Sequence, residues 1–299
     1  MIDFINYYFD LYPININKMD DKYVFYDNLD KYYFVPYDRS IEELNELIEL
    51  NKEMIRNNSL VSEIIFNKFN KVLNNYDNKN YILLRVYVND NKKVDISDII
   101  FMLNEGEIIN TNKNISRVNW SNLWESKIDY LEYQMGHLIK KYPILYSYID
   151  YYIGLGENAI VYLKDVVPYY NGRIIYGVCH RRIGVNSTLF DLYNPLNLII
   201  DYKVRDIGEY IKDAFFNNYN VDNIVNYIFN NYHFDKLNLS LLVCRLLFPT
   251  YFFDVFDFIV LEDKKENNIF KITKKSSDFE DFISNFIKMN NLQTIGWIK

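Results

Sequence analysis

The sequence predicts an α+β fold, in which a small antiparallel sheet comes first and a larger helical part follows. Aromatic and β-branched runs, which are typical of strands, are concentrated in the first part of the 299-residue chain. Beyond it, apolar residues recur mostly at helical spacing. The polar run 89–93 separates the two patterns. We therefore expect a sheet lobe over residues 1–90 and a helical lobe over residues 91–299.

A β-hairpin is predicted near the start of the first lobe. The runs 23–26 and 31–35 are rich in Tyr, Phe and Val, and Asp27-Asn28 between them favours a turn. A further strand is predicted over 81–88, where most residues are apolar. Residues 57–80 are rich in Asn and show only weak helical spacing, so their structure stays open.

One helix of the first lobe is predicted to pack against this sheet. Ser40 followed by Glu43 is the pattern of a capping box, in which the side chain of each residue accepts a hydrogen bond from the backbone N–H of the other. The apolar residues after it fall on one helical stripe, which we expect to face the sheet. That stripe comprises Ile41, Leu44, Ile48 and Ile55.

The second lobe begins with two predicted helices. Asn122 and Glu125 favour a helix start, and the apolar residues that follow keep near-heptad spacing. A second helical stretch follows Pro143 and runs to about Val167, with a break expected at Gly154.

Short buried strands and further helices complete the second lobe. The runs 174–178 and 196–200 are expected as strands. Asp206 and Glu209 are expected to cap a helix that follows the second of them. Residues 221–261 and 279–289 are also predicted to be helical.

The composition excludes several classes of function. The formal net charge is −7 and the pI is about 5.1, and basic residues are mixed with acids, so neither nucleic acid nor an anionic membrane is an expected partner. The apolar stretch 240–261 contains Arg, Pro and Asp residues, which favour a buried helix pair over a membrane span. The first residues lack a signal-peptide pattern, and two cysteines are too few for a disulfide framework or a zinc site. We therefore expect synthesis in a reducing cytosol.

Residues 179–201 contain the pattern that is most informative about chemistry. In kinase-like phosphotransferases, a His-x-Asp loop supplies the group that orients or deprotonates the attacking hydroxyl. A second Asp, after a short apolar strand, binds Mg²⁺. Here His180-Arg181-Arg182 corresponds to the loop, and Asp201 ends the apolar run 198–200. Asp201 is therefore a candidate Mg²⁺ ligand, although an Asp at a strand end also has purely structural roles.

Several separated motifs, in one order, resemble the YutH-type spore-coat-associated proteins. This family is related to the CotS-type coat proteins and is classed with the aminoglycoside phosphotransferase and protein-kinase-like fold. The resemblance implies a bilobal fold, a place in the spore coat after synthesis in the mother cell, and other spore coat proteins as partners. The motifs are 120–132, 151–160, 179–183, Asp201, 205–207 and 244–249.

Two groups that phosphotransfer requires are missing from the expected positions of this loop. Arg182 stands at the base position, and a guanidinium has no lone pair with which to take a proton. Ser187 stands where a metal-binding Asn is expected, although a one-residue shift would place Asn186 there. The catalytic loop is therefore degenerate, with Asp201 as a candidate metal ligand and Asn186 as a weaker one.

The first lobe lacks the groups that hold the phosphates of ATP. Val35 or Pro36 occupies the position of the strand lysine, and Lys31 lies at the strand start, where we expect its side chain to point to the lobe edge. Glu46 is a candidate helix partner for such a lysine, but we expect it to be a solvated helix acid. All nine glycines lie from Gly106 onward, so a glycine-rich phosphate loop is missing as well.

These observations favour a catalytically degenerate pseudokinase with a structural or interaction role in spore coat assembly. No cofactor is expected in this interpretation. The alternative is an active phosphotransferase that acts on a small molecule or a coat protein, and only this alternative requires Mg-ATP.

Overall fold

The computed structural model describes residues 1–57, 59–104, 106–108, 110–111, 113–138, 141–170 and 172–296. The chain folds into two compact units, which are described separately. The first unit comprises residues 1–94, 112–116 and 186–199, and the second comprises 95–111, 117–185 and 200–299. Segment 186–199 therefore packs with the sheet, although it is distant from the sheet in sequence.

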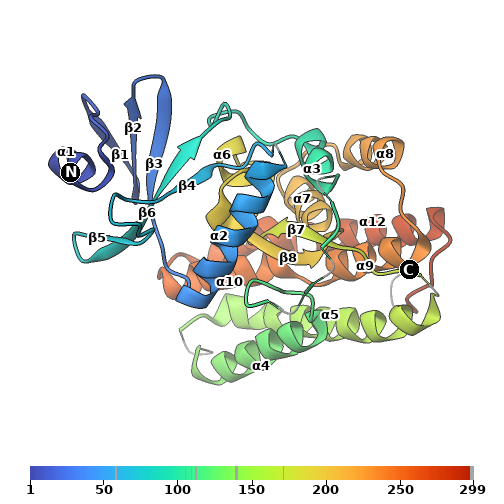
Figure 1. The fold of residues 1–299 in the computed structure, drawn as a ribbon. Coiled ribbons are helices and arrows are strands. Elements are labelled where there is room, and N and C mark those ends of the chain that lie inside the picture. The colour runs from blue at the N-terminus through green and yellow to red at the C-terminus, as the bar shows by residue number, and fades with distance from the viewer. Residues whose placement is uncertain are drawn as a thin grey trace. The chain divides into compact units, whose positions relative to one another are not determined.

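An antiparallel six-stranded sheet forms the centre of the first unit (Figure 1). The strands follow the order β1-β2-β3-β6-β4, and β5 also pairs with β6. The predicted hairpin is confirmed, since Asp27 pairs with Asp30 across a two-residue turn. The strands are β1 (Ile16–Met19), β2 (Lys22–Asp27), β3 (Asp30–Pro36), β4 (Glu63–Ile65), β5 (Asn74–Tyr76) and β6 (Lys79–Val86).

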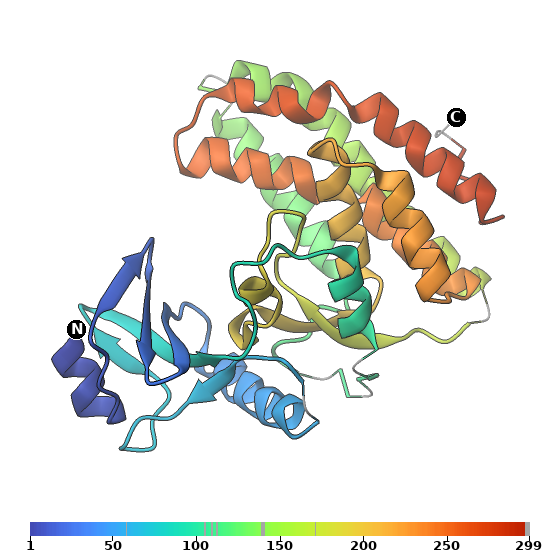
Figure 2. The same cartoon turned by 90° about the horizontal axis from the view of Figure 1, so that it is seen from above.

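An N-terminal helix that the sequence pattern did not indicate covers one face of this sheet. Helix α1 (Ile2–Phe9) buries Ile5 in a cluster of aromatic and aliphatic side chains. In this cluster the ring of Phe34 stacks on that of Tyr81, with centroids 4.7 Å apart. Figures 1 and 2 show α1 and α2 (Ile41–Arg56) on opposite sides of the sheet.

The start of α2 is confirmed, but its buried stripe is not the predicted one. The hydroxyl of Ser40 accepts a hydrogen bond from the backbone N–H of Glu43. Ile41 is 53 % exposed, and Ile48 and Ile55 are only partly buried. Of the predicted stripe, only Leu44 is buried. The buried face consists of Leu44, Leu47, Leu50, Met54 and the polar residue Asn51.

The stretch whose structure the sequence left open contains two short strands, β4 and β5. β4 and β5 both pair with β6, which is a contact that local spacing does not reveal. Asn51 supports β4, since its side chain donates to the carbonyl of Ser62 and accepts from the N–H of Ile64. The turn between β5 and β6 is Asp77-Asn78, and both residues have φ above +50°, as a two-residue hairpin turn requires.

The second unit is mainly helical, as predicted. Its two-stranded sheet pairs β7 (Tyr176–His180) with the end of β8 (Leu198–Tyr202). Segment 186–199 contributes α6 (Leu189–Leu192) and η1 (Pro195–Asn197) to the first unit. The helices of the second unit are α3 (Ile96–Leu103), α4 (Trp120–Leu138), α5 (Pro143–Tyr169), α7 (Arg205–Phe216), α8 (Val221–Asn231), α9 (Lys236–Leu247), α10 (Thr250–Leu261), η2 (Glu266–Ile269), α11 (Phe270–Thr273) and α12 (Ser276–Met289).

Helix α5 is continuous, so the break expected at Gly154 is wrong. Helices α4 and α5 lie side by side, as Figure 1 shows. A Cβ on Gly154 would meet no atom within 4 Å, whereas one on Gly156 would lie 3.1 Å from Cδ1 of Ile128 on α4. Gly156 therefore allows the close approach of the two helices, and Gly154 does not serve this purpose.

One described stretch, Lys236–Leu261, is long and apolar enough by composition to cross a membrane. It consists of α9 and α10, with Phe248-Pro249 between them. Within its most apolar window, 83 % is buried inside the structure. The predicted buried helix pair is therefore confirmed.

We predict that Gly156→Leu destabilises the protein by about 1–3 kcal/mol, because the new side chain overpacks the contact with Ile128. Gly154→Leu is the matched control, and we expect it to be neutral or slightly stabilising because leucine has the higher helix propensity. Urea denaturation of both variants measures the difference. Equal effects at the two positions would show that close helix packing does not explain Gly156.

Candidate functional site

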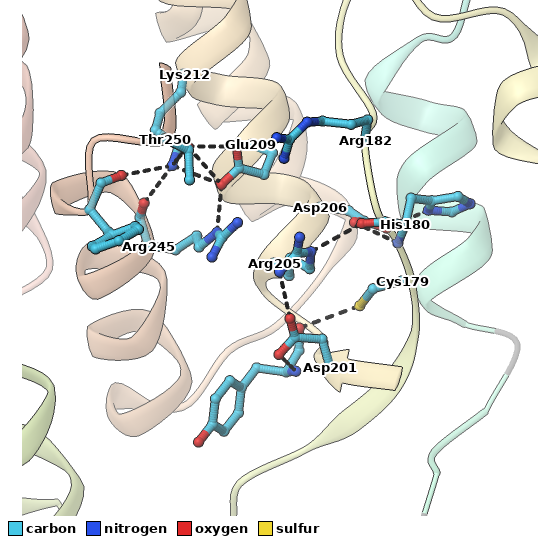
Figure 3. Close-up of polar contacts among 12 residues, drawn as sticks. Cys179, His180, Arg182, Asp201, Arg205, Asp206, Glu209, Lys212, Arg245 and Thr250 are labelled. Atoms are coloured by element: carbon cyan, nitrogen blue, oxygen red, sulfur yellow. Dashed lines mark hydrogen bonds and ion pairs between the residues drawn. The ribbon is translucent and has the colours of Figure 1, made fainter. Parts of the chain in front are cut away.

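The residues of the predicted catalytic loop lie where β7 ends, and α7 packs against this point (Figure 3). The carboxylate of Asp206, on the first turn of α7, binds His180 twice. Its Oδ1 accepts from the backbone N–H of His180 at 3.1 Å, and its Oδ2 lies 2.6 Å from Nδ1 of the imidazole. Both residues are buried. The expectation that Asp206 caps its own helix is wrong, since α7 has no side-chain cap and this carboxylate serves β7 instead.

Asp201, near the end of β8, and Arg205, the first residue of α7, form a buried ion pair. Nη1 of Arg205 lies 2.7 Å from Oδ2 of Asp201, and Oδ1 accepts from the backbone N–H of Tyr202 at 2.8 Å. The Asp201 side chain is 0 % exposed. Burial raises its pKa, and the charges of Arg205 and Arg245 oppose this rise.

The guanidinium of Arg205 also holds the backbone of the loop. Its Nε donates to the carbonyl of His180 at 3.0 Å, and its Nη2 to the carbonyl of Arg181 at 3.5 Å. Arg205 therefore connects the end of β7 with Asp201 at the end of β8. Figure 3 shows the carboxylates of Asp201 and Asp206 on either side of this guanidinium.

The remainder of the loop is fixed to α7 by a second carboxylate. Oδ2 of Asp213 accepts from the backbone N–H of Val185 at 2.8 Å. A Cβ on Gly184 would lie 2.2 Å from the same oxygen, so only glycine permits this contact. Burial raises the pKa of Asp213.

The two arginines of the loop are exposed. Nη2 of Arg182 lies 2.6 Å from Oδ1 of Asp254 on α10, with 68 % and 44 % of the two side chains exposed. An exposed pair of this kind contributes about 0–1 kcal/mol. Arg182 therefore presents a cation at the base position, and its partner is an acid that the sequence analysis did not connect with it.

Asn186 belongs to the first unit, where its Oδ1 accepts from Nζ of Lys93 at 3.2 Å. Ser187, its neighbour, accepts from the N–H of Val94 through its carbonyl at 2.9 Å. Both contacts join this segment to the residues that follow β6.

The residues at and near the expected position of the missing strand lysine make other contacts. Val35 is buried in β3. Nζ of Lys31 lies 2.5 Å from Oδ2 of Asp90, which also accepts from the Tyr33 hydroxyl, so the lysine does not point to a free edge. Burial and this hydrogen bond raise the pKa of Tyr33.

Glu46 is not the solvated helix acid that we expected. Its Oε1 accepts from the backbone N–H and the side chain of Asn114, at 3.0 and 2.8 Å. Its Oε2 accepts from the N–H of Ile115 at 2.9 Å. Glu46 therefore anchors Asn114 and Ile115 on α2.

A buried polar cluster on α7, α9 and α10 was missed by the sequence analysis. Glu209 binds Nε of Arg245 at 2.5 Å and Nζ of Lys212 at 2.8 Å. The Lys212 ammonium also donates to the carbonyls of Arg245 and Phe248 and to the hydroxyl of Thr250. A possible signal was the set of charges spaced three and four residues apart on a helix that is otherwise buried.

Neither cysteine is reactive in this arrangement. Sγ of Cys179 donates to the carbonyl of Tyr202, and both thiols are buried, which raises their pKa values. Among the residues that the structure describes, no group of three or more His, Cys, Asp or Glu side chains could hold a metal ion.

A family model described as "Spore coat putative kinase YutH" matches residues 2–286. The chain belongs to the YutH family. The endospore coat-associated protein YutH of Bacillus subtilis (strain 168) is 24 % identical over 194 residues, which cover 58 % of this chain and 57 % of that protein. The match thus spans little more than half the length of this curated relative.

Solved structures show the same fold. An aminoglycoside phosphotransferase from Alicyclobacillus acidocaldarius is similar with a TM-score of 0.69 at 9 % identity, over 95 % of this chain and 94 % of that one. A spectinomycin phosphotransferase, solved with ADP and spectinomycin, gives a TM-score of 0.57 at 10 % identity, over 96 % and 92 %. This chain therefore has the kinase-like fold of aminoglycoside phosphotransferases, as the sequence predicted.

We predict that Asp201→Ala destabilises the protein by about 3–5 kcal/mol, because it leaves the buried guanidinium of Arg205 without its counter-ion. Replacing both partners, as Asp201→Leu with Arg205→Met, should recover much of this loss. Urea denaturation with and without Mg²⁺ measures both effects. A small loss for Asp201→Ala, together with stabilisation of the wild type by Mg²⁺, would contradict a structural ion pair.

Lys212 should make stability depend on pH. Its side chain is 1 % exposed, and burial lowers its pKa to about 7, against the opposing charge of Glu209. Because the unfolded chain retains this proton up to about pH 10, the free energy of unfolding should rise with pH above 7. Between about pH 7.5 and 9, the free energy of unfolding of the wild type should rise by roughly 1 kcal/mol per pH unit relative to that of Lys212→Met. Lys264→Met, which alters an exposed lysine, is the control, and parallel profiles for wild type and Lys212→Met would contradict the prediction.

Proposed function

We propose that this chain is a pseudokinase of the spore coat, in which the former phosphotransfer site serves to hold the structure together. The buried pair of Asp201 and Arg205 is the observation that carries this proposal. A Mg²⁺ ion needs carboxylate oxygens with free lone pairs and room for water ligands. This donor set does not fit such an ion, because one oxygen accepts from a guanidinium, the other from a backbone N–H, and the group is fully buried.

The base position supports the same proposal. Arg182 carries a permanent positive charge and pairs with Asp254 at the surface. His180 is turned inward, with its imidazole on Asp206 and 1 % of the residue exposed. Neither side chain is therefore placed to take a proton from a substrate hydroxyl.

An active phosphotransferase acting on a small molecule or a coat protein is the second candidate. One observation favours it. Lys22 lies on β2 directly beside Val35 of β3, since Tyr23 pairs with Phe34 and the strands are antiparallel. Its ammonium reaches the same face of the sheet on which the strand lysine is missing. In this candidate, Lys22 would hold the phosphates of Mg-ATP.

The family supports a proposal on the place of action. We propose that the chain is made in the mother-cell cytoplasm, joins the spore coat and binds other spore coat proteins there. The curated relative is described as endospore coat-associated, which supports this location. We expect neither a nucleic-acid partner nor a membrane span, given the net charge of −7 and the burial of the most apolar stretch.

Phosphotransfer from ATP tests the proposal directly. The purified chain, incubated with Mg²⁺ and ATP labelled on the γ-phosphate, should transfer no label to water, to itself or to a spore coat extract. An aminoglycoside phosphotransferase with its substrate is the positive control. Transfer that Lys22→Ala abolishes, in a variant with unchanged stability, would replace the pseudokinase by the second candidate.

Coat association should not depend on the degenerate loop. A tagged chain produced in sporulating Bacillus subtilis that lacks its own YutH should be recovered in the coat extract. Arg182→Ala should be recovered in the same amount, because it alters only an exposed ion pair worth about 0–1 kcal/mol. Recovery in the forespore cytoplasm, or loss of coat association for Arg182→Ala, would contradict a structural role that is independent of this loop.

A further inference from the structure

One face of β3 carries Lys31, Tyr33 and Val35, because residues two apart on a strand share a face. Val35 is one of the two positions, with Pro36, at which the strand lysine of a kinase is expected. The contact of both Lys31 and Tyr33 with Asp90 agrees with that register. The opposite face, with Phe34, packs in the α1 cluster.

An aromatic side chain of the chain itself covers this face. The ring of Phe190, on α6, stacks on the ring of Tyr33 with centroids 4.1 Å apart and planes 23° apart. Each of the two residues is 3 % exposed. A stacked contact at this distance is the one that a flat heteroaromatic ring would make with Tyr33.

A lysine from the neighbouring strand completes the arrangement. Nζ of Lys22 lies 4.8 Å from the ring centroid of Phe190 and 5.5 Å from that of Tyr33. An ammonium over two rings is attracted by both, and it could equally bind an anionic group attached to a ring. The face thus combines a ring platform with a cation.

Segment 186–199 is fastened to the first unit on both sides of Phe190. Before it, the N–H of Leu189 donates to the carbonyl of Lys92 at 2.8 Å. After it, the carbonyl of Tyr193 accepts from the N–H of Ser62 at 2.8 Å. Nη1 of Arg39 on the same unit donates to the carbonyls of Leu196 and Leu198. These bonds to three separate parts of the unit hold Phe190 over Tyr33.

We propose that Tyr33 and Lys22 form a binding site for an aromatic ring that carries a phosphate group, and that Phe190 occupies this site in the native protein. This inference rests on the proposed function, because it gives the reason why a pseudokinase would not take up nucleotide. The ring of Phe190 takes the place that the aromatic ring of a ligand would occupy on Tyr33. A phosphate attached to such a ring therefore cannot be brought to the ammonium of Lys22. Removing the Phe190 ring exposes the site.

Binding of ADP without metal to Phe190→Ala tests the inference, with adenosine and inorganic phosphate as probes of the ring and the anion alone. Isothermal titration should show that ADP binds Phe190→Ala at least on the order of tenfold more tightly than the wild type. The reason is that the Phe190 ring no longer occupies the site, so a larger fraction of the molecules can bind ADP. Adenosine should bind this variant more weakly than ADP, and phosphate should not bind measurably. Adding Lys22→Ala to Phe190→Ala should remove the advantage of ADP over adenosine.

Two further variants keep the test decisive. Phe190→Leu retains an apolar side chain and part of the packing, so it replaces Phe190→Ala if the latter does not fold. Phe25→Leu alters a stacked pair in the α1 cluster, on Tyr32, and controls for a loosened first unit. Equal ADP binding by wild type and Phe190 variants, or none by any folded Phe190 variant, would overturn the inference. The proposed function is tested by a different result, namely phosphate transfer by the wild type. The two outcomes are independent, since a Phe190 variant can bind ADP without transferring phosphate.

Discussion

The second unit depends on one constraint, namely that the charged side chains of α7 are buried or partly buried and must therefore be paired. A buried ion without a partner costs several kcal/mol, so its surroundings have to supply a counter-charge or hydrogen bonds. Five charged residues occupy this helix, and their partners lie on different elements. Arg205 pairs with β8, Asp206 with β7, Glu209 and Lys212 with α9 and the start of α10, and Asp213 with the loop after β7.

This arrangement explains how the site keeps its geometry without a ligand. Asp206 fixes His180, and Arg205 fixes the carbonyls of the loop and the carboxylate of Asp201. None of these contacts requires a nucleotide or a metal. Arg182 pairs instead with Asp254 at the surface, where a substitution removes an exposed ion pair worth about 0–1 kcal/mol.

Local patterns predicted the fold class, most helices and the hairpin, because those features depend on residues close together in sequence. The same patterns failed where the partner is distant. Asp206 has the residue type and place of a helix cap, but its partner His180 lies 26 residues away. The strands β4 and β5 are three residues each and exist through pairing with β6, while α1 depends on the aromatic cluster that it covers. The resemblance of 179–183 to a catalytic loop located the site, but no pattern indicated the pairs that hold it.

The absence of glycine from the first unit has a more specific meaning in the structure than in the composition. The described residues of this unit with positive φ are all Asn or Asp, types that tolerate the left-handed region. The hairpin turns therefore form without glycine, and its absence costs the sheet little. The turns of this sheet thus meet the requirements of folding without glycine. Under the pseudokinase proposal no phosphate has to approach these turns, so nothing opposes a side chain at each position with positive φ.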